Sequence, residues 1–133
     1  MNRILALWRT AIGKKIAMAV SGILLLLVFV VYHLLHYTFG TVHPDFRHGE
    51  VGRNLIVGMQ SPLVAGFYVV SMLALGLHFW HGTWSVFQTL GANHPAWNRT
   101  RNVIAILLAI VVAGGFLLIP LAALVGRLSL PTP

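Results

Sequence analysis

Two histidines stand inside long apolar runs of this sequence, and each is followed by a second histidine three residues later. The pairs are His33 with His36 and His78 with His81. An ionisable or metal-binding side chain inside a membrane span is costly, usually faces the interior of a helix bundle and marks a functional site by default. Neutral imidazole is also a preferred axial ligand of haem iron. The pattern therefore raises the question of whether these histidines hold a redox cofactor inside a bilayer.

The composition indicates an integral membrane protein. Of the 133 residues, 58% are hydrophobic and only 8% are charged, whereas a soluble domain carries about 25% charged residues. Such a chain cannot cover its core with a polar surface, so lipid must cover the outside. It has no cysteine and cannot by itself hold an iron–sulfur cluster through thiolates. Its net charge of +7 is scattered over termini and loops, so we expect no nucleic-acid partner.

Three apolar segments are each longer than the roughly 20 residues needed to cross the hydrocarbon layer. They cover about residues 12–39, 61–90 and 102–125. The sequence therefore predicts an all-α integral membrane protein whose residues 1–133 form one membrane-anchor domain. We expect three transmembrane helices in a bundle that helices of partner chains complete.

The boundaries of the second segment are marked by residues that favour a helix start and a helix end. Ser61 suits an N-cap, Pro62 suits the first helical turn, and Gly91 follows the last apolar turn. The preceding residues, 40–60, read as an exposed loop that contains both acidic residues of the chain, Asp45 and Glu50. A loop of that length is either functional or a plain solvated turn. If functional, its carboxylates are candidates for a proton relay.

The basic residues predict the orientation, because Lys and Arg concentrate on the inner side of a membrane protein. The N-terminal segment and the second loop share one side and together carry six basic residues, against three on the opposite side. We therefore expect the N-terminus inside and the C-terminus outside. The six are Arg3, Arg9, Lys14, Lys15, Arg99 and Arg101, and the three are Arg47, Arg53 and Arg127.

Helix register separates the two candidate ligands. Antiparallel packing of the first two segments places His33 level with about Tyr68 and His78 level with about Gly22 or Ile23. The offset is some ten residues, or about 15 Å along the membrane normal. One haem cannot be ligated by both. If both are ligands, they serve two haems, and each haem takes its second imidazole from another chain.

The residues around the histidines suit a cofactor pocket, but they also suit ordinary helix packing. An intramembrane histidine can simply hydrogen-bond a neighbouring helix, for about 1 kcal/mol. Gly76 and Gly82 leave room for a flat macrocycle, and small residues also line plain helix contacts. We assign His33 and His78 as ligands and His36 and His81 as hydrogen-bonding partners of a haem propionate or a quinone. The residues sharing these helix faces are Tyr37 in the first segment and Trp80, Gly82, Trp84 and Ser85 in the second, while His43, His48 and His94 lie in loops.

Several stretches resemble the cytochrome b membrane anchor of succinate dehydrogenase and fumarate reductase, most closely the dihaem, menaquinone-linked type. They are IGKKIAMAVSG (residues 12–22), YHLLHYT (32–38), PDFRHGEV (44–51) and LHFWHGTWSVFQTLGANHP (77–95). The resemblance covers about residues 10–126. That family usually has five helices in one chain, and this sequence is similar to its last three. A separate small anchor subunit could supply the missing helices, or the chain could be a shortened form.

The resemblance implies a non-catalytic electron-transfer subunit of respiratory complex II in a bacterial or archaeal cytoplasmic membrane. It implies two b haems per complex, with His33 on the outer haem and His78 on the inner one, and menaquinone or another quinone as the electron partner. The implied partners are a flavoprotein and an iron–sulfur protein on the inner side. Lys14 and Lys15 would dock the iron–sulfur subunit or neutralise haem propionates, although interfacial anchoring explains them as well.

Two other classes of function remain compatible with the residues. The chain could be a haem-free anchor whose histidines bind quinone or hold helices together. Alternatively, its imidazoles could share an iron–sulfur centre with the cysteines of a partner. A transporter subunit fits less well, because three helices show no internal repeat and no pair of broken helices.

Overall fold

The computed structural model describes residues 11–92 and 94–130, with side chains from Gly22 onward. All regular secondary structure in this part of the chain is helical, as the sequence predicted. In chain order the elements are α2 (Ala11–His33), the π-helical turn η1 (Leu34–Thr38), α3 (Val51–Met59), α4 (Pro62–Thr89), the 3-10 turn η2 (Pro95–Trp97) and α5 (Asn98–Leu124).

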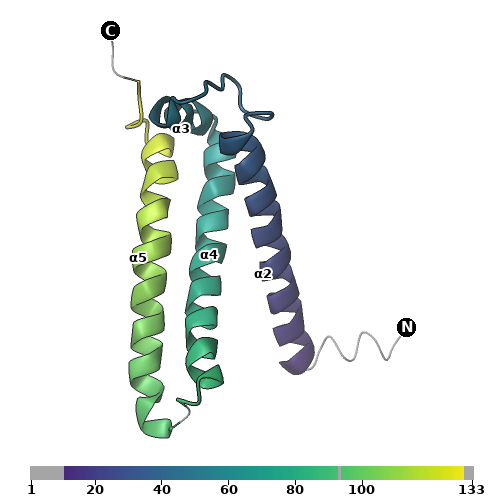
Figure 1. Ribbon diagram of the computed structural model, residues 1–133, viewed down its shortest axis with the longest axis vertical. Coiled ribbons are helices and arrows are strands. Elements are labelled where there is room, and N and C mark those ends of the chain that lie inside the picture. Colours follow the sequence, from purple (N-terminus) through teal and green to yellow (C-terminus); the bar gives the residue numbers. More distant parts are fainter. Residues whose placement is uncertain (1–10, 93, 131–133) are drawn as a thin grey trace, which may run out of the picture.

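The long helices α4 and α5 form an antiparallel pair, and α2 stands on the other side of α4 (Figure 1). A β-carbon built on Gly76 of α4 would lie 3.1 Å from the β-carbon of Ala113 of α5. Small residues at this crossing let the two backbones approach closely, as they do in membrane bundles. The ring contacts of α2 with α4 are all made by residues from Phe29 onward, and α2 leans away from α4 toward its start (Figure 1).

Two of the helical segments are long and apolar enough to cross a membrane, namely Pro62–Thr89 and 95–124. Within the described side chains, the first segment contributes a shorter apolar helix from Gly22 to Thr38. Large apolar side chains are exposed along these helices, for example Leu77, Val111 and Leu118, each more than three-fifths exposed. Such a surface is unfavourable in water and favourable in lipid.

The second predicted segment coincides with α4. Ser61 is its N-cap residue and Pro62 its first residue, although the Ser61 hydroxyl makes no capping hydrogen bond. Gly91 follows the helix with φ +80°, a conformation that glycine adopts without a side-chain clash. The third helix begins at Asn98 rather than near Asn102. The first turn of α5 consists of polar residues. The start of the apolar run therefore predicted a helix start several residues after the actual one.

The expectation of a loop throughout residues 40–60 was wrong, because α3 forms there. Leu55 and Met59 lie one helical turn apart and pack against Tyr68 of α4. Burial of these two side chains stabilises a nine-residue helix that would be marginal in isolation. The short apolar pattern is interrupted by Gly52 and Gly58, so the sequence alone did not indicate it.

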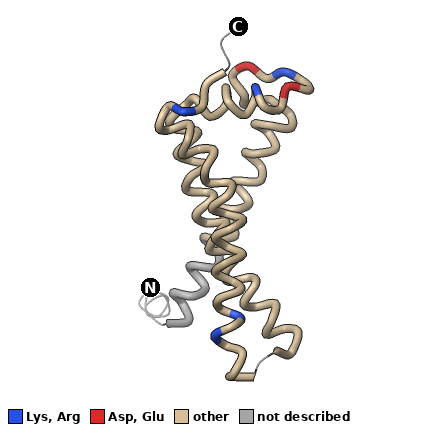
Figure 2. Tube along the Cα trace, turned by 90° about the vertical axis from the view of Figure 1, so that its left-hand side faces the viewer, with Lys and Arg blue, Asp and Glu red and all other residues tan. Residues whose placement is uncertain are grey.

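Charges are distributed unequally between the two ends of the bundle. In the described part of the chain, acidic residues lie only at the end that carries α3, which we call the α3 end (Figure 2). Basic residues lie at both ends, and those opposite α3 are Arg99 and Arg101 beside the η2 turn. We call that opposite end the η2 end.

Candidate functional site

The π-helical turn η1 turns His36 into the interior. The amide of Phe39 donates to the carbonyl of Leu34 at 2.9 Å, the i to i+5 bond of a π turn. The His36 side chain is fully buried, and its Nδ1 lies 3.2 Å from the Tyr68 hydroxyl of α4. Its Nε2 has no hydrogen-bond partner. An unpaired buried ring nitrogen is costly, and π turns are frequent at functional sites.

The backbone of α3 covers this unpaired nitrogen. A β-carbon built on Gly58 would lie 2.8 Å from His36 Cε1 and 2.9 Å from both His36 Nε2 and the Tyr37 hydroxyl. The Tyr37 hydroxyl is also buried without a partner. Two unpaired polar atoms therefore face the same glycine. No haem can reach His36 Nε2 unless α3 moves, so a hydrogen bond to a small polar group is the role this geometry permits.

His43 is buried beside the same cluster. Its ring centroid lies 5.0 Å from that of His36. The Asp45 amide donates to His43 Nδ1 at 3.1 Å, which leaves Nε2 as the donor to the Asn54 carbonyl at 2.7 Å. These two bonds define a neutral imidazole with its proton on Nε2. The sequence placed this histidine in a loop, as a solvated or hydrogen-bonded residue, and the structure selects the hydrogen-bonded alternative.

Both carboxylates of the loop are paired with arginine. Arg53 hydrogen-bonds Asp45 and lies 3.6 Å from Glu50, and Arg47 lies within 4 Å of each carboxylate. The hydrogen bond from Arg53 lowers the pKa of the Asp45 carboxyl below its usual value. Carboxylates held in this way organise the loop over α3. A role in proton relay, which the sequence suggested, is not required to explain their positions.

His33 is the last residue of α2 and is exposed, although its ring lies against aromatic rings of its own segment and of α4. Its centroid is 6.2 Å from that of Tyr68 and 5.5 Å from that of Phe29. No described residue hydrogen-bonds the ring. The contact with Tyr68 confirms the register predicted from the sequence.

His78 lies on α4 ten residues after Tyr68, which places it about 15 Å from the level of His33 along the helix axis. It is exposed, and no described residue hydrogen-bonds its ring. A β-carbon built on Gly82, one turn further on, meets no atom within 4 Å. Open space therefore adjoins the imidazole on its own helix face. The separation of the two rings excludes a single iron bound by both.

The remaining predicted residues divide between a cavity and the open face of α4. His81 and Trp84 line a cavity at the η2 end together with Trp80 and Asn102. Ser85 is half-buried and follows His78 by seven residues, on the same face of the helix. Lys14 and Lys15 belong to α2, but their side chains lie outside the described residues.

Arg101 is the residue that the sequence reading missed as a site. In the sequence, Arg101 served only as one of the six basic residues that predict the orientation in the membrane. The structure buries it to 4% exposure, with its guanidinium carbon 5.7 Å from the ring centre of Trp84. The signal available in the sequence was its position at the start of a long apolar run, one turn from Asn98 and next to Asn102.

Comparison of the chain with family models, with curated proteins and with solved structures found no match. Within the described residues, no three side chains of histidine, cysteine, aspartate or glutamate cluster closely enough to hold a metal ion. The functional interpretation therefore depends on the individual imidazoles and on the sequence stretches quoted above.

Proposed function

We propose that this chain is the membrane-anchor cytochrome b subunit of a succinate:quinone oxidoreductase. The observation that carries the proposal is the pair of exposed, unpaired imidazoles, His33 and His78, held about 15 Å apart along two antiparallel apolar helices. An anchor with one ligand for each of two haems needs this separation. The sequence stretches that resemble the dihaem anchor contain both histidines.

The proposal includes three transmembrane helices in a bacterial or archaeal cytoplasmic membrane. The lengths and apolar character of α4 and α5 support two of the crossings, and the apolar segment Gly22–Thr38 supports the third. The excess of basic residues at the N-terminus and in the second loop favours the η2 end as the inner side. The α3 end then faces outward.

The residues present are compatible with haem. His33 and His78 would each offer one axial nitrogen, because no described residue hydrogen-bonds either ring. Gly82 leaves space beside His78, and Ser85 on the same face can donate a hydrogen bond to a propionate. When bound, haem b supplies a one-electron redox centre. The second imidazole of each iron would come from a partner helix.

The chain's own task in such a complex is to hold redox groups at two depths and to keep their surroundings apolar. A flavoprotein and an iron–sulfur protein at the inner side would carry out the dicarboxylate chemistry. Movement of an electron between the two depths is coupled to the membrane potential, at about 2.3 kcal/mol per charge and 100 mV for full crossing. Menaquinone or another quinone would be the membrane partner.

A haem-free quinone-binding anchor is the second candidate, and one observation favours it. His36 Nε2 and the Tyr37 hydroxyl are buried without partners beside Gly58. They offer hydrogen-bond donors of the kind that a quinone carbonyl accepts, and a quinone would reach them only after a movement of α3 away from Gly58's present position. In this alternative, His33 and His78 would contact lipid or partner helices instead of iron.

An optical spectrum of the purified native complex tests the proposal. We expect b-type bands of bis-imidazole haem and two haems for each copy of this chain. A complex that contains the chain in full amount but shows no such bands would exclude the cytochrome and favour the haem-free anchor. A single haem per chain would contradict the two-level arrangement.

A further inference from the structure

His43 ties the loop that precedes α3 to α3 itself, and it does so as a neutral imidazole. The residue is 8% exposed. Its Nδ1 accepts the Asp45 amide, and its Nε2 donates to the Asn54 carbonyl. A second proton would have to go to Nδ1, where it would meet the Asp45 N–H group instead of an acceptor. Protonation of His43 therefore breaks one of the hydrogen bonds that close the loop.

The groups around the His43 ring do not compensate for a positive charge. From η1, His36 and Tyr37 face it with ring centroids at 5.0 and 6.0 Å, and neither side chain is an anion. In its own loop the Asp45 carboxylate faces it, but that carboxylate is half-exposed and is already paired with Arg53 of α3. A buried charge without a free counter-ion is costly. Protonation should therefore favour a state in which His43 meets water.

The helix that His43 restrains covers two polar atoms that have no partner. His36 Nε2 and the Tyr37 hydroxyl are buried against Gly58. Each would gain a hydrogen bond from water or from a ligand if α3 moved. Against this gain stand the apolar contacts of α3 with α4 and its polar contacts with the loop. The closed position of α3 therefore depends on the loop contacts.

The connections of α3 allow it to move as one unit. Only Gln60 and Ser61 link it to α4, and Ser61 has an extended backbone. On its other side, the Asn54 side chain makes two hydrogen bonds with the Arg47 backbone, at 2.7 and 3.0 Å. The helix lies across the end of the bundle (Figure 1). Rotation about the short link to α4 would lift it without unwinding it, once the contacts with the loop are broken.

We propose that α3 is a lid over His36 and Tyr37, held closed by neutral His43 and released when the medium at the α3 end becomes acidic. Release exposes the two unpaired polar atoms and leaves the α4/α5 pair intact. In the orientation proposed above, the lid responds to the pH of the outer side. The inference goes beyond the proposed function, since it requires neither haem nor a partner chain.

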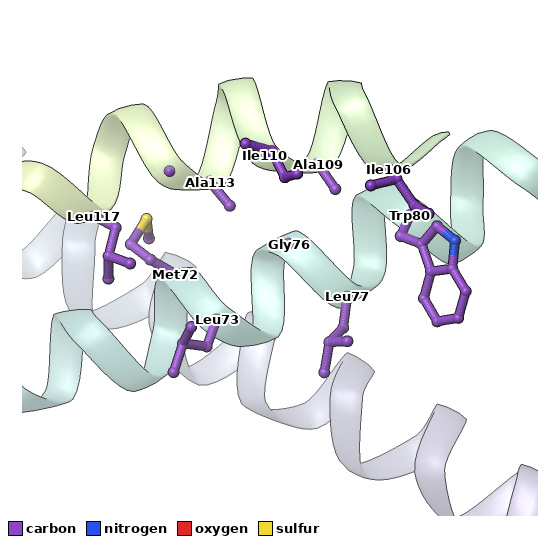
Figure 3. A pocket seen from close by; sticks show the side chains of 11 residues that line it. Met72, Leu73, Gly76, Leu77, Trp80, Ile106, Ala109, Ile110, Ala113 and Leu117 are labelled. Carbon is purple, nitrogen blue, oxygen red and sulfur yellow. The ribbon is translucent and has the colours of Figure 1, made fainter. Parts of the chain in front are cut away.

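Amide hydrogen–deuterium exchange of the full chain in detergent, read by mass spectrometry at about pH 7.5 and about pH 5.5, tests the lid. Protection is the measured rate divided into the intrinsic rate of an unstructured peptide at the same pH. An imidazole that titrates only in the open state favours opening about tenfold between these values. We therefore expect about a tenfold loss of protection in α3. Amides along the α4/α5 groove, which is lined by residues without titratable side chains (Figure 3), should keep theirs.

Two variants separate the effect of His43 from a general effect of acid. Glutamine offers a donor and an acceptor but does not titrate, so in His43→Gln the protection of α3 should be equal at the two pH values. His48→Gln, the matched control at an exposed position of the same loop, should retain the tenfold response. The Asp45 carboxyl stays ionised at both values, because its pKa lies below the usual one.

Three results would overturn the lid. One is equal protection of α3 at both pH values in the wild type, and another is a pH response that persists in His43→Gln. The third is a parallel loss of protection in α3 and α4, which would show general unfolding. Low protection of α3 at both pH values in His43→Gln would instead support His43 as the residue that holds the lid. Each result is independent of haem, so failure of the lid leaves the proposed cytochrome untouched.

Discussion

At the residue scale, neighbouring histidines of η1 and α2 occupy opposite environments. His33 is exposed, and His36 is enclosed between Tyr68 and Gly58. Spacing alone placed both on one helix face. The two environments differ because His36 belongs to the π-helical turn and is covered by α3. Its Nε2 is buried without a partner against the backbone of that helix.

Gly58 gives this arrangement a direct test. In Gly58→Ala the new β-carbon would come within 3 Å of the His36 ring and the Tyr37 hydroxyl, so these buried rings must shift. We expect the variant to be destabilised by about 1–3 kcal/mol, measured as loss of the helical circular dichroism signal on heating in detergent. Gly52→Ala in the same helix is the matched control, since nothing lies within 4 Å of its β-carbon. Equal unfolding temperatures of both variants and the wild type would show that α3 does not cover His36.

At the element scale, the long helices were predictable and the short one was not. Long, mainly apolar runs determine α4 and most of α5, and the Ser-Pro and Gly signals delimit α4. The start of α5 and the whole of α3 depend on contacts that form only after folding. The same holds for His43, whose hydrogen bonds to Asn54 and Asp45 require the loop to close over α3.

The loop that holds α3 should respond to acid through Asp45. The hydrogen bond from Arg53 lowers the pKa of this carboxyl in the folded protein. Its contribution to stability is therefore present above the unfolded pKa, about 3.9, and is lost as the pH falls through the folded pKa. We expect Asp45→Asn to lower the unfolding temperature at pH 7, and the difference from wild type to shrink as the pH falls below the unfolded pKa of about 3.9.

Salt provides the control for the acid response. Because Asp45 and Arg47 are solvent-exposed, high salt should weaken their pairing and reduce the effect of Asp45→Asn at pH 7. If Asp45→Asn lowered the unfolding temperature equally at pH 2 and pH 7, the ion-pair explanation would be contradicted. The change would then come from the new asparagine side chain and not from the loss of the carboxylate charge.

At the scale of the whole molecule, the described bundle leaves both candidate ligands, His33 and His78, exposed. The helices α4 and α5 pack closely at Gly76 and Ala113, whereas the ring contacts of α2 with α4 are made by the last turns of α2. His78 and Gly82 lie on a face of α4 that no described helix covers. In the proposed complex, helices of partner chains would complete the bundle and supply the second ligand of each haem. The sequence of this chain alone therefore could not identify those second ligands.

The measurement that tests the central claim most directly is a redox titration of the haem bands in the native complex with single replacements. We expect His33→Ala to remove one haem component and His78→Ala to remove the other, while His81→Ala, one turn away and also exposed, leaves both. Loss of both components on one replacement, or of neither on either, would contradict the assignment of the two histidines to haems at different depths.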